Sequence, residues 1–221
     1  MIGPPRALAS QRKIVDRLSW LMPGCLGVNR RSMQLDGLSL QIVDPGTRAP
    51  KGVILYLHGG AFCLGSPRSH YSVTSRLARD SGCAVWVPDY RLAPEHPYPA
   101  ALEDCLACYD AIRAQLCPAD KLLIAGDSAG GALVLALALA LKERGDGIAA
   151  GLMLLSPVTD PDLGGASMQS HQEADPMIRR DWLEQALKAY AAPVQALSHR
   201  PLEADPVSYT HLRAHETSLH L

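Results

Sequence analysis

The sequence predicts a single α/β domain in which a mostly parallel β-sheet is covered by helices on both faces. Short apolar runs alternate with longer helical patterns along most of the chain. The strand-like runs at 53–57, 83–87, 121–125 and 151–155 are apolar on both faces, which is typical of strands buried in a parallel sheet. The chain has 221 residues, 48% of them apolar, which is enough for one cored domain with a small lid.

The other expected elements follow from periodicity and from turn residues. A hairpin of strands 32–35 and 38–43 turns at Asp36-Gly37. In the helix expected at 69–81, we predict Tyr71, Leu77 and Ala78 as the buried side. The remaining predicted helices cover residues 7–21, 100–115, 131–144 and 182–191.

Composition excludes several classes of protein. The net charge of −1 gives no indication of a nucleic-acid or anionic-membrane partner. The first residues lack the uninterrupted apolar segment of a secretory signal, and no apolar run is long enough to span a bilayer. Cys105 and Cys108 form a C-x-x-C pair on a helical pattern without a second pair, so we expect core positions and a reduced, cytoplasmic protein.

Residues 126–131 hold the pattern most indicative of chemistry. Gly126-Asp127-Ser128-Ala129-Gly130 lies between an apolar strand and a strong helix former, which is the arrangement of a nucleophile elbow. Side chains at Gly126 or Gly130 would clash with neighbouring backbone in so tight a turn. An N-capping serine in a small-residue turn is the alternative, and the strand–helix context favours the nucleophile.

A second glycine-rich turn follows the strand at 53–57. His58-Gly59-Gly60 would let backbone N–H groups approach a developing oxyanion. In elbow enzymes the residue after the nucleophile, here Ala129, supplies another donor. Taken alone, the motif could be a turn with a structural histidine, which is less plausible beside an elbow.

Four segments together resemble the hormone-sensitive lipase family of α/β-hydrolase esterases. They are residues 58–62, 89–95, 99–104 and 126–131, and their order and spacing also match. The resemblance covers about residues 30–205. It implies an α/β-hydrolase fold and a bacterial-type carboxylesterase that acts on short to medium acyl chains without a metal or organic cofactor.

The resemblance also implies roles for single residues. Ser128 would be the nucleophile, and the amides of Gly59, Gly60 and Ala129 would form the oxyanion hole. His58 would orient the loop rather than act as the base, and residues 89–95 would support that loop.

The resemblance to the family also divides the chain into three parts. Residues 1–27 would be an N-terminal cap helix region, and residues 28–206 an α/β-hydrolase core with a cap segment at about 160–195. Residues 207–221 do not resemble the family and match the in-frame translation of a sequencing-library adapter, so we expect a non-native tail that includes His211, His215 and His220.

In this fold the triad acid and base follow the serine in the order acid, then histidine. They would come after two further strands beyond 151–155, and at roughly 30 residues per strand–helix unit about 60 residues are needed. We therefore expect that the acid and base are absent, that the sheet is incomplete at the C-terminus, and that this chain has little turnover. His171 and His199 are the alternative candidates for the base, and Asp175 or Asp181 preceding His199 has the right order. Their position in the predicted cap, before the last strands, argues against both.

Three functions fit these residues. The first is a serine carboxylesterase that works through an acyl-enzyme. The second is a non-catalytic ligand-binding member of the fold, and the third is amide or lactone hydrolysis by the same mechanism. The partner would be a small-molecule ester, and a homodimer of the full-length protein stays open.

Overall fold

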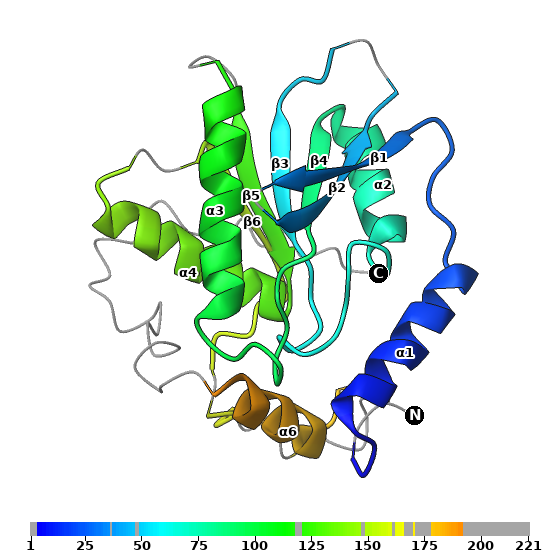
Figure 1. The fold of residues 1–221 in the computed structure, drawn as a ribbon, viewed down its shortest axis with the longest axis vertical. Helices are drawn as coiled ribbons and strands as arrows, with labels where there is room; N and C mark the ends of the chain where they lie inside the picture. Colours follow the sequence, from blue (N-terminus) through cyan, green and yellow to red (C-terminus); the bar gives the residue numbers. More distant parts are fainter. Residues whose placement is uncertain are drawn as a thin grey trace.

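The computed structural model describes residues 4–35, 37–46, 49–117, 121–146, 149–160, 162–165, 170 and 178–191. Its sheet has six strands in the order β1-β2-β4-β3-β5-β6 (Figure 1). The bounds of the strands are β1 Asn29–Leu35, β2 Leu38–Asp44, β3 Val53–Leu57, β4 Ala84–Pro88, β5 Leu122–Asp127 and β6 Gly151–Leu155.

Strand pairing confirms a mostly parallel sheet. β1 and β2 form an antiparallel hairpin, and β2 is also antiparallel to β4. β4, β3, β5 and β6 run parallel to one another. In the register of β3 and β5, Leu57 lies opposite Gly126, so the two glycine-rich turns leave the same edge of the sheet side by side.

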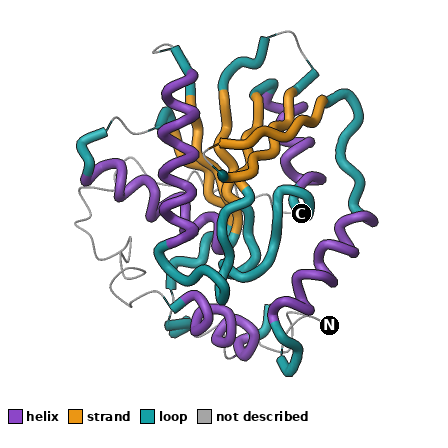
Figure 2. Tube along the Cα trace, viewed as in Figure 1, coloured by secondary structure: helices purple, strands orange, loops and turns teal. Residues whose placement is uncertain are grey.

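Alternate residues of β3 face two separate apolar clusters, because successive side chains of a strand point to opposite faces. Leu55 and Leu57 belong to the larger cluster, which includes Cys105 and Leu133 of the helices α3 (Ala100–Gln115) and α4 (Ala129–Glu143). Ile54 belongs to the smaller cluster with the helix α2 (Tyr71–Ser81). Helices therefore cover both faces, and Figure 2 shows the strands between them.

Two helices lie apart from these layers. The helix α6 (Arg180–Tyr190) lies at the bottom of Figure 1, and the helix α1 (Leu8–Leu18) rises from beside it along the right-hand side to the short 3₁₀ helix η1 (Ser19–Leu21). The indole N–H of Trp182 in α6 donates to Oε1 of Gln11 in α1 at 2.9 Å. This bond joins two segments far apart in the sequence into one layer beside the loops that follow β3 and β4.

The buried side of α2 differs from the prediction. Ala78 is fully buried, but Tyr71 and Leu77 are only partly buried. Small hydroxyl residues, Ser72, Thr74 and Ser75, occupy the rest of the buried side. The hydroxyls of Thr74 and Ser75 donate to the carbonyls of His70 and Ser72, and the Ser72 hydroxyl accepts a bond from Arg76. These polar side chains are therefore buried without losing a partner.

Cys105 and Cys108 lie in the core, as expected, and burial raises the pKa of both thiols. Across the part of the chain that the structure describes, no helix has the length and apolar character to cross a membrane.

Candidate active site

The turn between β5 and α4 places Ser128 in a strained conformation. Its φ is 51° and its ψ −119°, which non-glycine residues rarely adopt. A Cβ on Gly126 would lie 2.6 Å from the carbonyl of Gly130, and a Cβ on Gly130 would collide with the carbonyl oxygen of Leu57. Both glycines are thus required for the backbone to pass this close, and Ser128 remains partly exposed.

Hydrogen bonds to the end of β6 and to the segment after it hold the strained turn. The Ser128 amide donates to the Leu155 carbonyl at 2.9 Å, and the Ser128 carbonyl accepts from the Val158 amide at 3.1 Å. Helix α4 begins at Ala129. Its first N–H groups have no partner within the helix, and the helix dipole favours negative charge beside them.

The loop after β3 has three successive residues in left-handed conformations. They are Gly60, Ala61 and Phe62, with φ of 125°, 51° and 61°. The Gly60 carbonyl accepts the Leu64 amide at 2.8 Å, and a Cβ on Gly60 would collide with the Leu64 carbonyl oxygen. We call residues 58–62 the oxyanion loop.

Asp127, the last residue of β5, connects the elbow to the oxyanion loop. Its carboxylate accepts the Gly59 amide at 2.9 Å and the Tyr56 hydroxyl at 2.8 Å, and Nε2 of His70 lies 3.5 Å away. Desolvation alone would raise the pKa of this carboxyl, but the bonds from His70, Tyr56 and Gly59 hold it below the ordinary value.

This geometry does not support a donor role for Gly59. The amide that the resemblance assigned to the oxyanion hole is already donated to Asp127. Among the described residues, no acceptor contacts the amides of Gly60, Ala61 or Ala129. These three N–H groups are therefore without an acceptor among the described residues, whereas the Gly59 amide has one.

His58 is buried completely beneath the loop. Its Nδ1 lies 2.9 Å from the Gly59 carbonyl, and its ring stacks on Tyr90 with centroids 4.2 Å apart. Burial, followed by the nearby His70, lowers the pKa of His58 to about 3. Its Nε2 has no partner among the described residues, so the ring is neutral with the proton on Nδ1 at ordinary pH.

The loop after β4 supports the oxyanion loop from the other side, as expected for residues 89–95. The Tyr90 hydroxyl donates to the His58 carbonyl at 2.6 Å, and the Ala93 amide donates to the Phe62 carbonyl at 3.0 Å. Arg12 of α1 donates to the carbonyls of Cys63 and Ala93. A residue of the N-terminal helix therefore contacts both loops at once.

Helix α6 covers the end of the oxyanion loop. The Tyr190 ring stacks on Phe62 with centroids 4.0 Å apart and planes within 6°, and Tyr98 meets Tyr190 edge-on. The Cys63 thiol lies 3.5 Å from the Ala186 carbonyl. Aromatic packing therefore closes one side of the site.

A family model of the α/β-hydrolase fold matches residues 54–217. The chain is 35% identical over 186 residues to an esterase of Acinetobacter venetianus, covering 84% of this chain and 60% of that protein. It is 38% identical over 139 residues to an acetyl-hydrolase of Streptomyces hygroscopicus, covering 63% and 46%. A crystal structure of an esterase from the bacterial hormone-sensitive lipase family superposes with a TM-score of 0.83 at 33% identity, covering 91% of this chain and 68% of that one.

The chain belongs to the hormone-sensitive lipase family of α/β hydrolases. A second member, a hormone-sensitive lipase from a metagenome library, superposes with a TM-score of 0.81 at 36% identity, covering 86% of this chain and 64% of that one. The chain spans 60% or less of the curated relatives named above.

Three residues at this site could not be identified from the sequence alone. Ala61 is held at a positive φ in the oxyanion loop, and the sequence gives no signal of this, because alanine rarely takes a positive φ. His70 lay within a predicted helix, yet it precedes α2 and reaches Asp127. Tyr56 lay in an apolar strand, and its hydroxyl shows its role only once β3 and β5 are paired.

The triad acid and base stay a prediction. His171, His199 and Asp175 lie outside the described residues. Asp181 accepts the Trp182 amide at 2.8 Å and pairs with Arg179 at 2.5 Å, so its carboxylate already has partners in the first turn of α6. Among the residues with described positions, no histidine side chain bonds to the Ser128 hydroxyl.

The predicted boundaries at residues 27 and 206, and the non-native tail at 207–221, also stay predictions. Within the described ranges, no three His, Cys, Asp or Glu side chains gather as metal ligands would.

Proposed function

We propose that this chain carries the nucleophile and the oxyanion hole of a serine ester hydrolase. One observation carries the proposal: the strained elbow of Ser128 is joined through Asp127 to a loop whose next amides have no intramolecular acceptor among the described residues. A serine at positive φ is strained, and a turn with only a structural role gains nothing from holding it beside N–H groups that lack an acceptor. The esterase relatives support the same conclusion.

In the proposed reaction the Ser128 oxygen attacks the ester carbonyl, and its proton passes to the base. A C–O bond forms, and the amides of Gly60, Ala61 and Ala129 stabilise the negative charge on the carbonyl oxygen. The tetrahedral intermediate collapses, and the alcohol leaves with the proton. Water then cleaves the acyl-enzyme by the same steps and releases the carboxylic acid. We propose that the base is a histidine of the longer natural sequence that would follow residue 206, and not one of the histidines in the tail at 207–221 of this chain.

The proposed substrates are esters of short to medium acyl chains. The relative from Streptomyces hygroscopicus is named an acetyl-hydrolase. The stacked rings of Phe62, Tyr190 and Tyr98 fill space beside the oxyanion loop, which favours small acyl groups. Lactones would react by the same route as cyclic esters, and amides would react with a less electrophilic carbonyl and a poorer leaving group.

The test is hydrolysis of p-nitrophenyl acetate, butyrate and decanoate. It uses this chain, the longer form read from the source genome, and Ser128→Ala in both. We expect the longer form to hydrolyse acetate and butyrate with complete dependence on Ser128, and the 221-residue chain to show little turnover. Comparable rates in both lengths would refute the placement of the base. No hydrolysis by the longer form, with tight binding of the same esters, would support a non-catalytic binder.

We propose a cytoplasmic location. Cys25, Cys63, Cys83, Cys105 and Cys108 are thiols rather than disulfides, which suits a reducing compartment. A melting temperature that is unchanged by dithiothreitol, together with recovery in the soluble cell fraction, would agree with this. Sedimentation of the longer form tests the homodimer that the sequence leaves open.

A further inference from the structure

The end of α1 and the segment after it expose a run of large apolar side chains. We call these residues the Trp20 patch: Leu18, Trp20, Leu21, Met22 and Leu26, with exposed fractions of 51%, 74%, 77%, 57% and 92%. Isolated exposed leucines are ordinary, but five large apolar side chains within nine positions indicate an interaction surface.

Contacts with α2 hold the backbone of the patch in place. Gly24 packs so closely on the ring of Tyr71 that any side chain there would collide with it. The Cys25 amide donates to the Ser75 hydroxyl at 2.9 Å. The segment is therefore anchored through its small residues, and the large apolar side chains remain exposed.

Basic side chains surround the patch. The guanidinium of Arg68 lies over the Trp20 ring, 3.9 Å from its centroid, and both Arg17 and Lys13 are exposed on α1. Residues 1–34 contain six Lys or Arg and one acidic residue, Asp16, although the whole chain has a net charge of −1. Two of the six have ion-pair partners outside this segment, Arg12 with Glu95 and Arg31 with Asp44, and the other four still outnumber Asp16. The balanced total thus conceals a basic N-terminal region.

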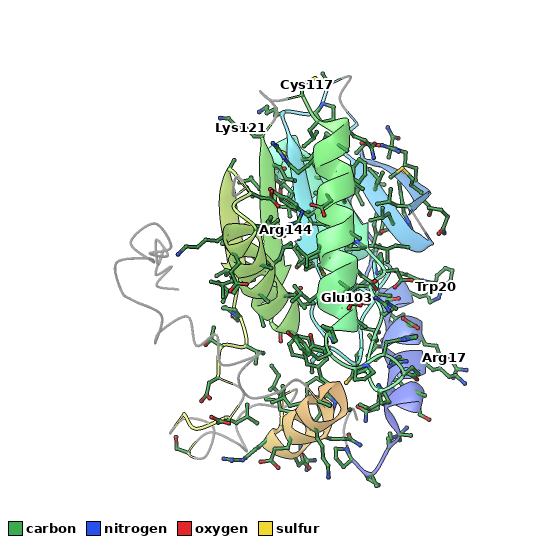
Figure 3. All side chains as sticks on the ribbon, turned by 60° about the vertical axis from the view of Figure 1, so that its left-hand side comes forward. Arg17, Trp20, Glu103, Cys117, Lys121 and Arg144 are labelled. Carbon is green, nitrogen blue, oxygen red and sulfur yellow. The ribbon has the colours of Figure 1, made fainter. Side chains whose placement is uncertain are left out.

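Figure 3 shows Arg17 and Trp20 at the same edge of the molecule, with Lys121 and Cys117 at the far end. An exposed tryptophan, neighbouring leucines and flanking arginines are the side chains that insert at the boundary between lipid headgroups and acyl chains. The arginines can hold their charge in the headgroup layer while the apolar groups enter below it.

We propose that the Trp20 patch docks this chain onto an anionic phospholipid surface. A second copy of the chain is a poorer occupant, because a two-fold contact through the patch would bring Arg17 and Arg68 close to the same basic residues of the other copy. Phospholipid phosphates instead complement this charge. The inference does not depend on the esterase proposal, since it uses no residue of the site.

The experiment measures binding of the 221-residue chain to phosphatidylglycerol–phosphatidylcholine vesicles and to pure phosphatidylcholine vesicles. Trp20 is the reporter, because the other two tryptophans, Trp86 and Trp182, are only 7% and 8% exposed. We expect co-sedimentation with the anionic vesicles and a blue shift of tryptophan emission. Raising NaCl from about 50 mM to about 300 mM should weaken binding, because salt screens the charges.

Substitutions separate the apolar from the charged contributions. Leu21→Ser with Leu26→Ser should abolish the co-sedimentation, and Arg17→Ala or Arg68→Ala should each weaken binding roughly fivefold. Trp20→Phe should retain most of the binding but lose the blue shift.

Matched controls lie elsewhere on the surface. Ile178→Ser removes an exposed apolar side chain outside the patch, and Lys121→Ala removes a basic one at the far end; neither should change binding. The proposal is overturned if the unaltered chain ignores anionic vesicles. It is equally overturned if the controls weaken binding as much as the patch variants, or if the patch variants change only self-association in sedimentation velocity. Unchanged melting temperatures establish that the variants are folded.

Discussion

The Asp127 carboxylate accepts the backbone N–H of Gly59 at 2.9 Å. The two residues are 68 positions apart, yet the parallel register of β3 and β5 sets Leu57 opposite Gly126 and so brings the ends of both strands together. One carboxylate then fixes the distance between the Ser128 turn and the oxyanion loop. The site is thus positioned by sheet register and completed by a single polar side chain.

Replacing Asp127 should disturb both stability and reactivity. Asp127→Ala leaves the Gly59 amide and the Tyr56 hydroxyl without their acceptor, so we expect a loss of about 2–4 kcal/mol in the free energy of unfolding. Tyr56→Phe removes one bond and should cost about 1 kcal/mol. Because the loop is then free to shift, kcat/KM of the longer form should fall about 100-fold for Asp127→Ala.

Urea denaturation and p-nitrophenyl acetate kinetics measure these effects. Asp110→Ala is the matched control, since this carboxylate pairs with Arg144 on the surface and should change stability by less than about 1 kcal/mol. A loss for Asp127→Ala no larger than that of the control would show that the carboxylate does not organise the loop.

His58 should make stability fall as the pH decreases. Its pKa is about 3 in the folded chain against 6.5 for an ordinary histidine. Between these values the unfolded chain binds one more proton than the folded chain, so the free energy of unfolding decreases by up to about 1.4 kcal/mol per pH unit as the pH falls. Asp127 has a lowered pKa, so the stability that it contributes is lost only below its unfolded value of about 3.9.

His58→Asn should flatten this slope between about pH 4.5 and pH 6.5. The measurement is urea denaturation at several pH values in that window. His96→Asn replaces an exposed histidine of the loop after β4 and should leave the slope unchanged. Equal slopes in the unaltered chain and His58→Asn would contradict the buried, neutral state of the ring.

The fold could be predicted from sequence because its signals are local. The buried strands are short apolar runs, and glycine or proline ends most elements, so β3 and α3 have the predicted bounds. The elbow was predictable for the same reason, since Ser128 and its glycines lie within six residues. In contrast, the buried side of α2 was partly wrong because its hydroxyl groups are satisfied by hydrogen bonds that periodicity does not show.

The details of the site depend on contacts between distant segments. Gly59 was expected to bind the oxyanion, but Asp127 takes its amide only because β3 and β5 are neighbours. His70 and Arg12 come from loops and helices whose relative positions are set by packing. The net charge of the whole chain did not indicate the basic region around Trp20, because a total close to zero does not show where along the chain the charged residues lie.

Alanine at either elbow glycine should be far more damaging than at a glycine with open space. Gly126→Ala and Gly130→Ala bring a Cβ against backbone atoms, so we expect losses above about 3 kcal/mol or failure to fold. Gly145→Ala is the control: its φ is 73° but no atom lies within 4 Å of the added Cβ, so it should cost about 1 kcal/mol. Thermal unfolding measures the stability of the three variants. Similar losses of stability at all three positions would mean that the backbone conformation, and not a clash of the added Cβ, requires these glycines.

Arg12 should matter through its bonds to carbonyls rather than through its ion pair. Its guanidinium donates to the Cys63 and Ala93 carbonyls and pairs with Glu95 at 2.7 Å. The Glu95 side chain is 48% exposed, so water screens the pair and Glu95→Gln should cost less than about 1 kcal/mol. Arg12→Ala removes a charged donor from two loop carbonyls and should cost about 2–3 kcal/mol.

Arg12→Lys distinguishes charge from geometry. Lysine keeps the positive charge but lacks the planar fork that reaches two carbonyls at once, so its stability should lie nearer to Arg12→Ala than to the unaltered chain. Because Arg12 joins α1 to the loops around the site, both Arg12 variants should also raise the KM of the longer form for p-nitrophenyl butyrate, while Glu95→Gln leaves it unchanged. If Glu95→Gln matched Arg12→Ala in stability and KM, the ion pair would be the contact that holds α1, and the role of the carbonyl bonds would be refuted.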